Sequence, residues 1–251
     1  MTGPRGPFDG FIIATAVLTR LPVGATRPVD GAVATAGWAF PLVGVGVGAL
    51  SAAAFFAAQA LGLSVPVAAL LAVLAAIGIT GAFHEDGLAD TVDGFGGGRT
   101  RETKLAIMRD SRHGTFGILA LVASVGLRAG ALATIGDPIH AGLALIAAHA
   151  VSRGALPPLM RLLPPARPDG LGAAAGRPSV AVALIAALLG AAIGVTVLGP
   201  AAGGPAVLYA MIALAAAAIL ARRQIGGYTG DVLGFFQQIG EIVMLLAAAA
   251  K

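Results

Sequence analysis

The chain has 251 residues, of which 57% are hydrophobic and only 11% are charged. Soluble domains carry about 25% charged residues, so this composition excludes a soluble protein and predicts a polytopic membrane protein in contact with the lipid bilayer. The absence of cysteine excludes disulfides, thiolate metal sites and cysteine nucleophiles. Arginine at membrane edges explains the formal charge of +4, so we expect no nucleic-acid partner.

The apolar segments predict an all-α membrane bundle. Residues 8–21 predict a short interfacial helix that ends at Pro22. A span needs about 20 apolar residues, and seven stretches qualify, at 37–62, 64–83, 115–136, 139–160, 179–198, 204–221 and 232–250. Because only short polar connections join them, we predict one domain over residues 1–251, with about seven transmembrane helices and a cytoplasmic helical segment at 84–113.

Lysine and arginine gather in alternate connections. Arg5, Arg20 and Arg27 precede the first span, and further basic residues follow the second, fourth and sixth spans. The intervening connections near 62–64, 136–139 and 199–204 contain neither residue, and Lys251 alone falls outside the pattern. The positive-inside rule therefore places the basic side, and the segment after the second span, in the cytoplasm.

Four of the twelve carboxylates in the chain stand within nine residues, at Glu85, Asp86, Asp90 and Asp93. On a helix the three aspartates occupy positions i, i+4 and i+7 of one face, with Glu85 about 100° around the axis. Such crowded carboxylates beside a membrane imply a compensating cation or proton. Mg²⁺ with a phosphate-bearing substrate fits best, because Mg²⁺ is usually bound by a few carboxylates together with phosphate oxygens of the substrate. Acids that merely stabilise a helix N-terminus are the plainer explanation.

Basic residues follow at the point where the chain re-enters the membrane. Arg109, Asp110, Arg112 and His113 come directly before the third span. Arginine forks match phosphate oxygens, so these residues are candidates for substrate binding. His113 either shuttles a proton or hydrogen-bonds a neighbour.

Polar residues also interrupt the later spans. Arg153 in the fourth span needs a substrate phosphate or an acid as its partner, and Arg128 in the third span needs a partner that the sequence does not name. Arg167 follows as a phosphate candidate or a plain loop charge. Thr229 and Asp231 precede the last span as site residues or helix caps. The intramembrane acid Glu241 has no capping explanation.

Several of these motifs resemble one known family. They are Leu18-Thr19-Arg20-Leu21-Pro22-Val23, the acidic run from Glu85 to Phe95, the run from Ile107 to Gly117, Ser152-Arg153, Ala166-Arg167 with Gly170-Leu171-Gly172, and the run from Gly226 to Asp231. In this order and membrane context the chain is similar, nearly end to end, to cobalamin synthases, the adenosylcobinamide-GDP ribazoletransferases.

The resemblance implies a Mg²⁺-dependent transferase of the bacterial inner membrane with its active site facing the cytoplasm. Such an enzyme joins α-ribazole, or its 5′-phosphate, to adenosylcobinamide-GDP and releases GMP in the last assembly stage of cobalamin. Glu85, Asp86, Asp90 and Asp93 would then form the catalytic metal site. The substrates would contact a second group, Arg109, Asp110, Arg112, His113, Arg153, Arg167, Thr229 and Asp231. A homo-oligomer is left open.

Two other functions compete with this interpretation. CDP-alcohol phosphotransferases also use clustered aspartates, but their Ala-Arg pair after the first aspartate-glycine is missing here, where Leu88-Ala89-Asp90 follows Asp86-Gly87. An ion-coupled transporter would place its site near the midplane between repeats. The chain shows no internal repeat, and its polar motifs gather at one membrane face.

Overall fold

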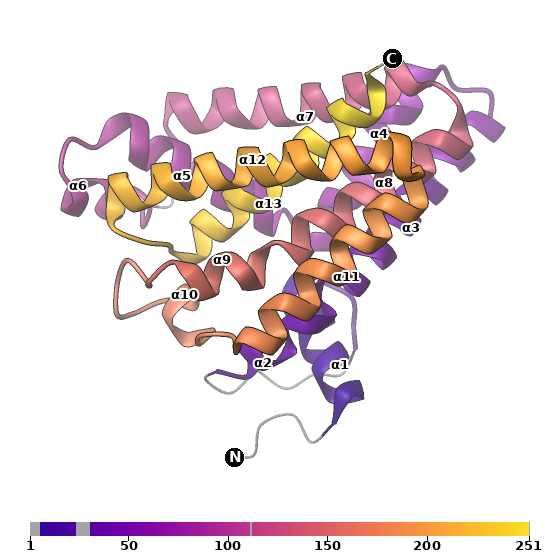
Figure 1. Ribbon diagram of the computed structural model, residues 1–251. Helices are drawn as coiled ribbons and strands as arrows, with labels where there is room; N and C mark the ends of the chain where they lie inside the picture. The colour runs from indigo at the N-terminus through magenta and orange to yellow at the C-terminus, as the bar shows by residue number, and fades with distance from the viewer. Residues whose placement is uncertain (1–5, 24–30, 111, 251) are drawn as a thin grey trace.

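A computed structural model describes residues 6–23, 31–110 and 112–250 (Figure 1). Arg5, Arg27 and Lys251, which entered the charge argument, lie outside these ranges. The helices are α1 (Pro7–Leu18), α2 (Ala32–Ala36), the 3-10 helix η1 (Gly37–Ala39), α3 (Phe40–Ala60), α4 (Val65–Thr80), α5 (Phe83–Gly97), α6 (Arg101–Ile107), α7 (Thr115–Ile135), α8 (Pro138–Gly154), α9 (Leu156–Leu162), α10 (Leu171–Ala174), α11 (Val180–Leu198), α12 (Pro200–Ile225) and α13 (Gly230–Ala249). Within the described ranges, β-structure is limited to an isolated bridge between Pro165 and Tyr228.

Six helical segments are long and apolar enough to cross a membrane: Ala32–Ala60, Thr115–Ile135, Pro138–Leu162, Val180–Leu198, Pro200–Ile225 and Gly230–Ala249. The α4–α5 pair adds a seventh if it crosses as one broken span. These helices confirm the predicted all-α polytopic membrane bundle.

The second predicted span, 64–83, is the one whose shape differs from the expectation. α4 ends at Thr80, and α5 starts at Phe83 after a bend of 92°. Gly81 and Ala82 both adopt left-handed backbone conformations, with φ of 66° and 57°, which α-helices do not accommodate. A Cβ on Gly81 would also lie 2.4 Å from the Arg20 Nε. The break therefore starts α5, and with it the acidic motif, inside the bundle.

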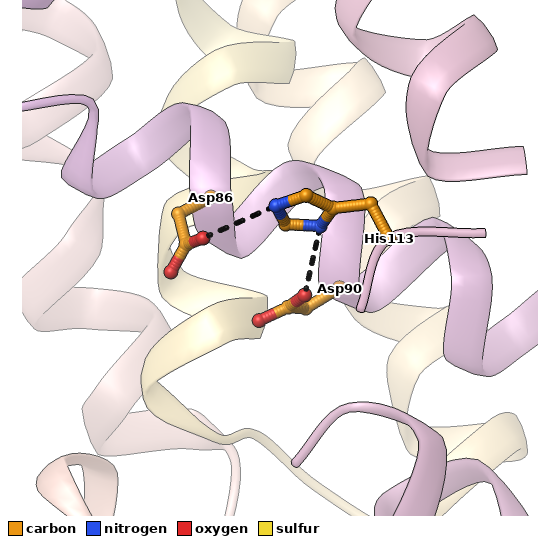
Figure 2. A group of neighbouring side chains, drawn as sticks. All are labelled: Asp86, Asp90 and His113. Carbon is orange, nitrogen blue, oxygen red and sulfur yellow. Dashed lines mark ion pairs between the residues drawn. The ribbon is translucent and has the colours of Figure 1, made fainter. Parts of the chain in front are cut away.

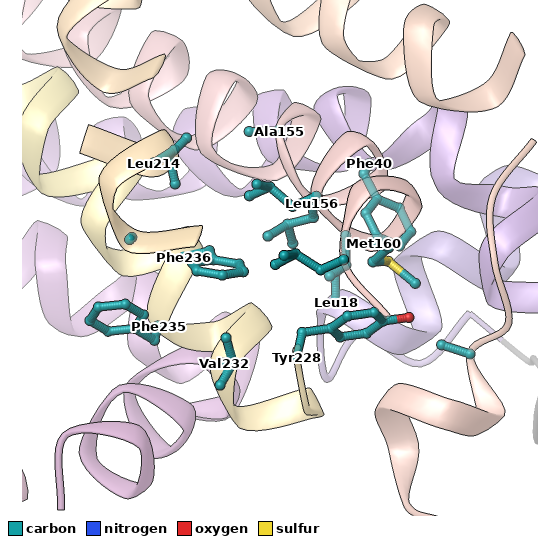
Figure 3. Close-up of a cluster of buried hydrophobic side chains, with 14 of the residues drawn as sticks. Leu18, Phe40, Ala155, Leu156, Met160, Leu214, Tyr228, Val232, Phe235 and Phe236 are labelled. Atoms are coloured by element: carbon teal, nitrogen blue, oxygen red, sulfur yellow. The ribbon is translucent and has the colours of Figure 1, made fainter. Parts of the chain in front are cut away.

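The apolar packing forms two clusters of buried side chains. One joins α1, α3, α9, α12 and α13, and Figure 3 shows part of it around Phe40, Leu156, Met160, Tyr228 and Phe236. The other joins α3, α4, α7, α8, α12 and α13 in a region rich in alanine. Small residues let helix backbones approach closely, so the alanines suit a bundle packed in lipid.

Basic connections meet at one end of the bundle. α6 lies there beside the end of α12, at the left of Figure 1. Arg101 donates from Nε to the carbonyl of Ile225 over 2.8 Å and also bonds the carbonyl of Ala166. Lys104 bonds Gln224 nearby. The segments after α5, α9 and α12 are thereby held together at this end of the bundle.

Candidate active site

Asp86, Asp90 and His113 form a compact polar group near the N-terminal end of α5 (Figure 2). The two acids lie one helical turn apart on the same face of α5, and His113 reaches them from the connection before α7. His113 Nε2 is 4.0 Å from Asp86 Oδ1, and His113 Nδ1 is 3.6 Å from Asp90 Oδ1. One ligand atom from each residue lies within 4.8 Å of the other two. This spacing suits a single small cation.

The exposure of these three side chains keeps the group accessible. The Asp86 side chain is 62% exposed, that of His113 40% and that of Asp90 15%. Carboxylates a turn apart on a helix repel each other, so the pair favours a positive charge between its oxygens. The group therefore combines open carboxylate oxygens with a nearby imidazole.

Asp93 holds the start of α7 in place. Its Oδ2 accepts from the Gly114 amide over 2.6 Å, and its Oδ1 accepts from the Gly117 amide over 2.8 Å. These amides belong to the first turn of a helix that has no cap side chain of its own. A Cβ on Gly117 would lie 2.3 Å from Asp93 Oδ2, so only glycine fits there. Because Gly114 adjoins His113, this cap also positions the imidazole.

Glu85 points away from this polar group and belongs to a buried ionic network. Arg128 Nη1 donates to Glu85 Oε1 and to Glu241 Oε1, each over 3.0 Å. His149 Nδ1 lies 3.1 Å from Glu241 Oε2 and 2.8 Å from Arg153 Nη1. All five side chains are at most 8% exposed. The network ties α5, α7, α8 and α13 together and supplies the partners that Arg128 and Glu241 needed.

Asp231, at the start of α13, lies near Asp86 and Asp90. It pairs with Arg167 from the segment after α9. Arg167 Nη2 lies 3.5 Å from Asp231 Oδ2, and Thr229 donates to the same oxygen over 3.1 Å. Thr229 also caps α13 by accepting from the Val232 amide over 3.3 Å. The Nη1 of Arg167 is buried and has no hydrogen-bond partner among the described residues. The guanidinium therefore keeps one donor group without an acceptor in the described part of the protein.

The remaining basic candidates lie on the surface. Arg109 Nη2 donates to both carboxylate oxygens of Asp169 over 2.6 Å. Arg112 bonds Asp110 through Nε and Nη2, and these bonds lower the pKa of the Asp110 carboxyl to about 2. Each guanidinium therefore has an exposed acid as its partner, which a stronger phosphate ligand would displace.

Comparison with known proteins then places the chain. The sequence profile of the family described as cobalamin-5-phosphate synthase matches residues 10–249. The chain belongs to the cobalamin-5-phosphate synthase family. A relative from Bradyrhizobium diazoefficiens (strain JCM 10833 / BCRC 13528 / IAM 13628 / NBRC 14792 / USDA 110), named adenosylcobinamide-GDP ribazoletransferase, is 52% identical over 239 residues, which cover 95% of this chain and 92% of the relative. A relative of the same name from Mesorhizobium japonicum (strain LMG 29417 / CECT 9101 / MAFF 303099) is 44% identical over 98% of this chain and 95% of its own length.

No solved structure matches the chain. The resemblance expected from the sequence motifs is confirmed, and the protein is a transferase of cobalamin synthesis.

The predicted site residues fall into three groups in the structure. Asp86, Asp90 and His113 lie together, with Asp231, Thr229 and Arg167 on the adjoining segments. Arg109, Asp110 and Arg112 lie on the neighbouring surface. Glu85 and Arg153 lie in the buried network, and Asp93 caps α7. Glu85 and Asp93 as metal ligands, and Arg153 as a phosphate contact, remain predictions. Each of these side chains already has a protein partner.

Sequence reasoning missed two members of this arrangement. His84 was not singled out, although it is 2% exposed and begins the acidic motif. His149, to which the sequence analysis gave no functional role, is an ionic partner of Glu241. The unpaired Arg128 was the available signal, because a buried cation in an apolar span requires buried acids nearby.

Proposed function

We propose that the chain is a Mg²⁺-dependent adenosylcobinamide-GDP ribazoletransferase. It joins α-ribazole, or its 5′-phosphate, to adenosylcobinamide-GDP and releases GMP, with its site facing the cytoplasm of a bacterial inner membrane. The observation that carries the proposed site is the grouping of Asp86, Asp90 and His113 within 4.8 Å. Family membership and the names of the relatives support the choice of substrates.

Asp86 and Asp90 are the side chains that would hold Mg²⁺. Their oxygens are hard ligands of the kind that Mg²⁺ prefers, and both retain room for water and substrate phosphates. When bound there, Mg²⁺ would supply positive charge to the pyrophosphate oxygens and the leaving group. Imidazole is a poorer ligand for this ion, so His113 is left free for proton transfer.

The chemistry assigned to the chain itself is positioning and proton transfer. The ribose hydroxyl of ribazole attacks the phosphorus on the cobinamide side, and an O–P bond forms as the bond to the GMP oxygen breaks. His113 accepts the hydroxyl proton, with Asp90 at 3.6 Å orienting its ring. The Arg167 guanidinium, which is 16% exposed and pairs with Asp231 at 3.5 Å, binds a phosphate oxygen.

The test uses the purified protein in lipid with adenosylcobinamide-GDP, α-ribazole and Mg²⁺. GMP and the corrinoid product are followed together, with and without a chelator, and Asp90→Asn serves as the inactive control. We expect both products in equal amounts, and none with chelator. If the unmodified, folded protein makes neither product from ribazole or its phosphate, the proposed function is wrong.

A further inference from the structure

An apolar groove lies between the α8–α9 segment, α11 and α12 and has no role in the mechanism above. Its volume is about 280 Å³, and five alanines form much of its wall. In Figure 1, α11 and α12 diverge from their shared connection, with α9 seen between them. The larger wall residues are open to the surroundings, since Leu162 is 73% exposed, Ile219 54% and Met211 48%. All the wall helices belong to segments long and apolar enough to cross a membrane, so the groove opens toward lipid.

The length of the groove matches one leaflet of a bilayer. Along α12 its wall extends from Val207 to Ile219, which is about 18 Å at the rise of an α-helix. Half of the hydrocarbon core of a bilayer measures about 15 Å. A single extended acyl chain therefore fits along the whole groove, where the alanines let it approach the helix backbones closely.

Basic residues continue the wall at one end of the groove. Arg222 follows Ala215 and Ala218 at i+7 and i+4, so all three lie on the same face of α12. On α9, Arg161 lies in the turn that ends with the wall residue Leu162. Neither arginine has an ion-pair partner among the described residues. Both positive charges therefore lack an anion from this part of the chain.

Hydrogen bonds hold the basic helix ends together. Arg101 bonds the carbonyls of both Ile225, at the end of α12, and Ala166, which follows α9. Arg177, which precedes α11, donates from Nη2 to the carbonyl of Arg161 over 3.0 Å. The helices that form the groove therefore have their basic ends on the same side of the bundle, where guanidinium groups can match a phosphate.

We propose that the groove binds one acyl chain of an anionic phospholipid, whose phosphate lies at the end that carries Arg161 and Arg222. Basic pockets between transmembrane helices bind anionic lipid headgroups in this way. A helix from a second copy is the competing occupant, but in the same membrane orientation it brings its own arginines to the same depth, where like charges repel. A lipid phosphate instead supplies the missing negative charge. The proposal rests on the membrane fold and is independent of the reaction proposed above.

Intact-complex mass spectrometry of the purified full chain in detergent tests the binding directly, with phosphatidylglycerol and phosphatidylcholine of the same acyl chains titrated separately. We expect one phosphatidylglycerol retained per chain and at least about tenfold weaker binding of phosphatidylcholine. Ala215→Phe fills the groove and should abolish retention, whereas Ala216→Phe, at an equally exposed position off the wall, should preserve it. Equal binding of the two lipids, equal retention by the two variants, or a lipid-free dimer would overturn the proposal.

Replacing single arginines tests the headgroup contact in proteins whose groove is intact. Arg222→Gln should weaken binding of phosphatidylglycerol about fivefold, the effect of one basic residue near a membrane surface, and leave binding of phosphatidylcholine unchanged. Arg223→Gln is the matched control, because it removes the same charge from an exposed position about 100° around α12. Equal weakening by both variants, or none by Arg222→Gln, would show that the headgroup does not lie at this end of the groove.

Discussion

Replacing Asp86 and Asp93 separately by asparagine would distinguish a metal ligand from a structural carboxylate. Both belong to the same acidic motif, yet their surroundings are opposite. Asp86 is 62% exposed, and its ion-pair partner among the described residues is His113 at 4.0 Å. Asp93 is 6% exposed, and both of its oxygens accept from amides at the start of α7.

The stability difference follows from these contacts. An asparagine at 93 keeps one acceptor oxygen but turns an amide group toward the second backbone N–H. The lost hydrogen bond to a charged group is worth about 1.5–3 kcal/mol, and the lost interaction of the anion with the helix N-terminus about 0.3–1 kcal/mol. Asp93→Asn should therefore lower the free energy of unfolding by about 2–4 kcal/mol. Asp86→Asn, at an exposed position, should change it by less than about 0.5 kcal/mol.

The two variants should differ in the opposite sense in activity: the more stable one should be the inactive one. Asp86→Asn should abolish turnover in a protein of normal stability, because it removes charge from the proposed Mg²⁺ site. Asp93→Asn should retain the unmodified protein's Mg²⁺ dependence in the fraction that remains folded. Reversible unfolding in mixed micelles and GMP release over a Mg²⁺ titration provide the two measurements. If Asp93→Asn is as stable as the unmodified protein and needs far more Mg²⁺, Asp93 is a metal ligand and our reasoning is refuted.

Four further predictions test the surroundings of the site. Glu241→Gln removes the anion that pairs with Arg128 and His149, so it should lower the free energy of unfolding by about 3–5 kcal/mol and reduce activity less than Asp86→Asn; equal loss of activity in the folded fraction would place Glu241 in the reaction. Gly117→Ala puts a Cβ 2.3 Å from Asp93 Oδ2 and should destabilise the protein, whereas Gly126→Ala, which has no atom within 4 Å of the new Cβ, should not; thermal unfolding compares them. Arg109→Ala breaks an exposed pair with Asp169 and should cost less than about 1 kcal/mol of stability, so a raised KM for adenosylcobinamide-GDP would reveal a phosphate contact and an unchanged KM would exclude one. The folded pKa of Asp110 is lowered to about 2, so its stabilising pair with Arg112 is fully present above the unfolded pKa of about 3.9 and is lost as the pH falls through about 2. Asp110 therefore does not titrate between about pH 5 and 8, and Asp110→Asn should leave the pH profile of activity in that range unchanged. A shifted profile would contradict this assignment.

The membrane character of the chain, and the placing of Asp86 and Asp90 on one face of a helix, were readable from the sequence. Apolar stretches of span length, separated by connections with alternating basic charge, are local properties that need no knowledge of packing. The same holds for Asp86 and Asp90, because residues four apart in a helix share a face whatever surrounds it.

The tertiary structure alone decided which polar residues belong together. Asp86 and Asp93 follow the same helical periodicity, but the approach of α7 gives Asp93 two backbone donors and leaves Asp86 open. Periodicity also did not reveal the bend after Thr80, which depends on two consecutive left-handed residues, one of them alanine. A buried arginine such as Arg128 requires acidic partners, but the sequence does not identify them. Glu85 and Glu241 are 43 and 113 residues away in sequence. Pairings over such separations depend on helix packing, because only the folded bundle brings those side chains out of water together.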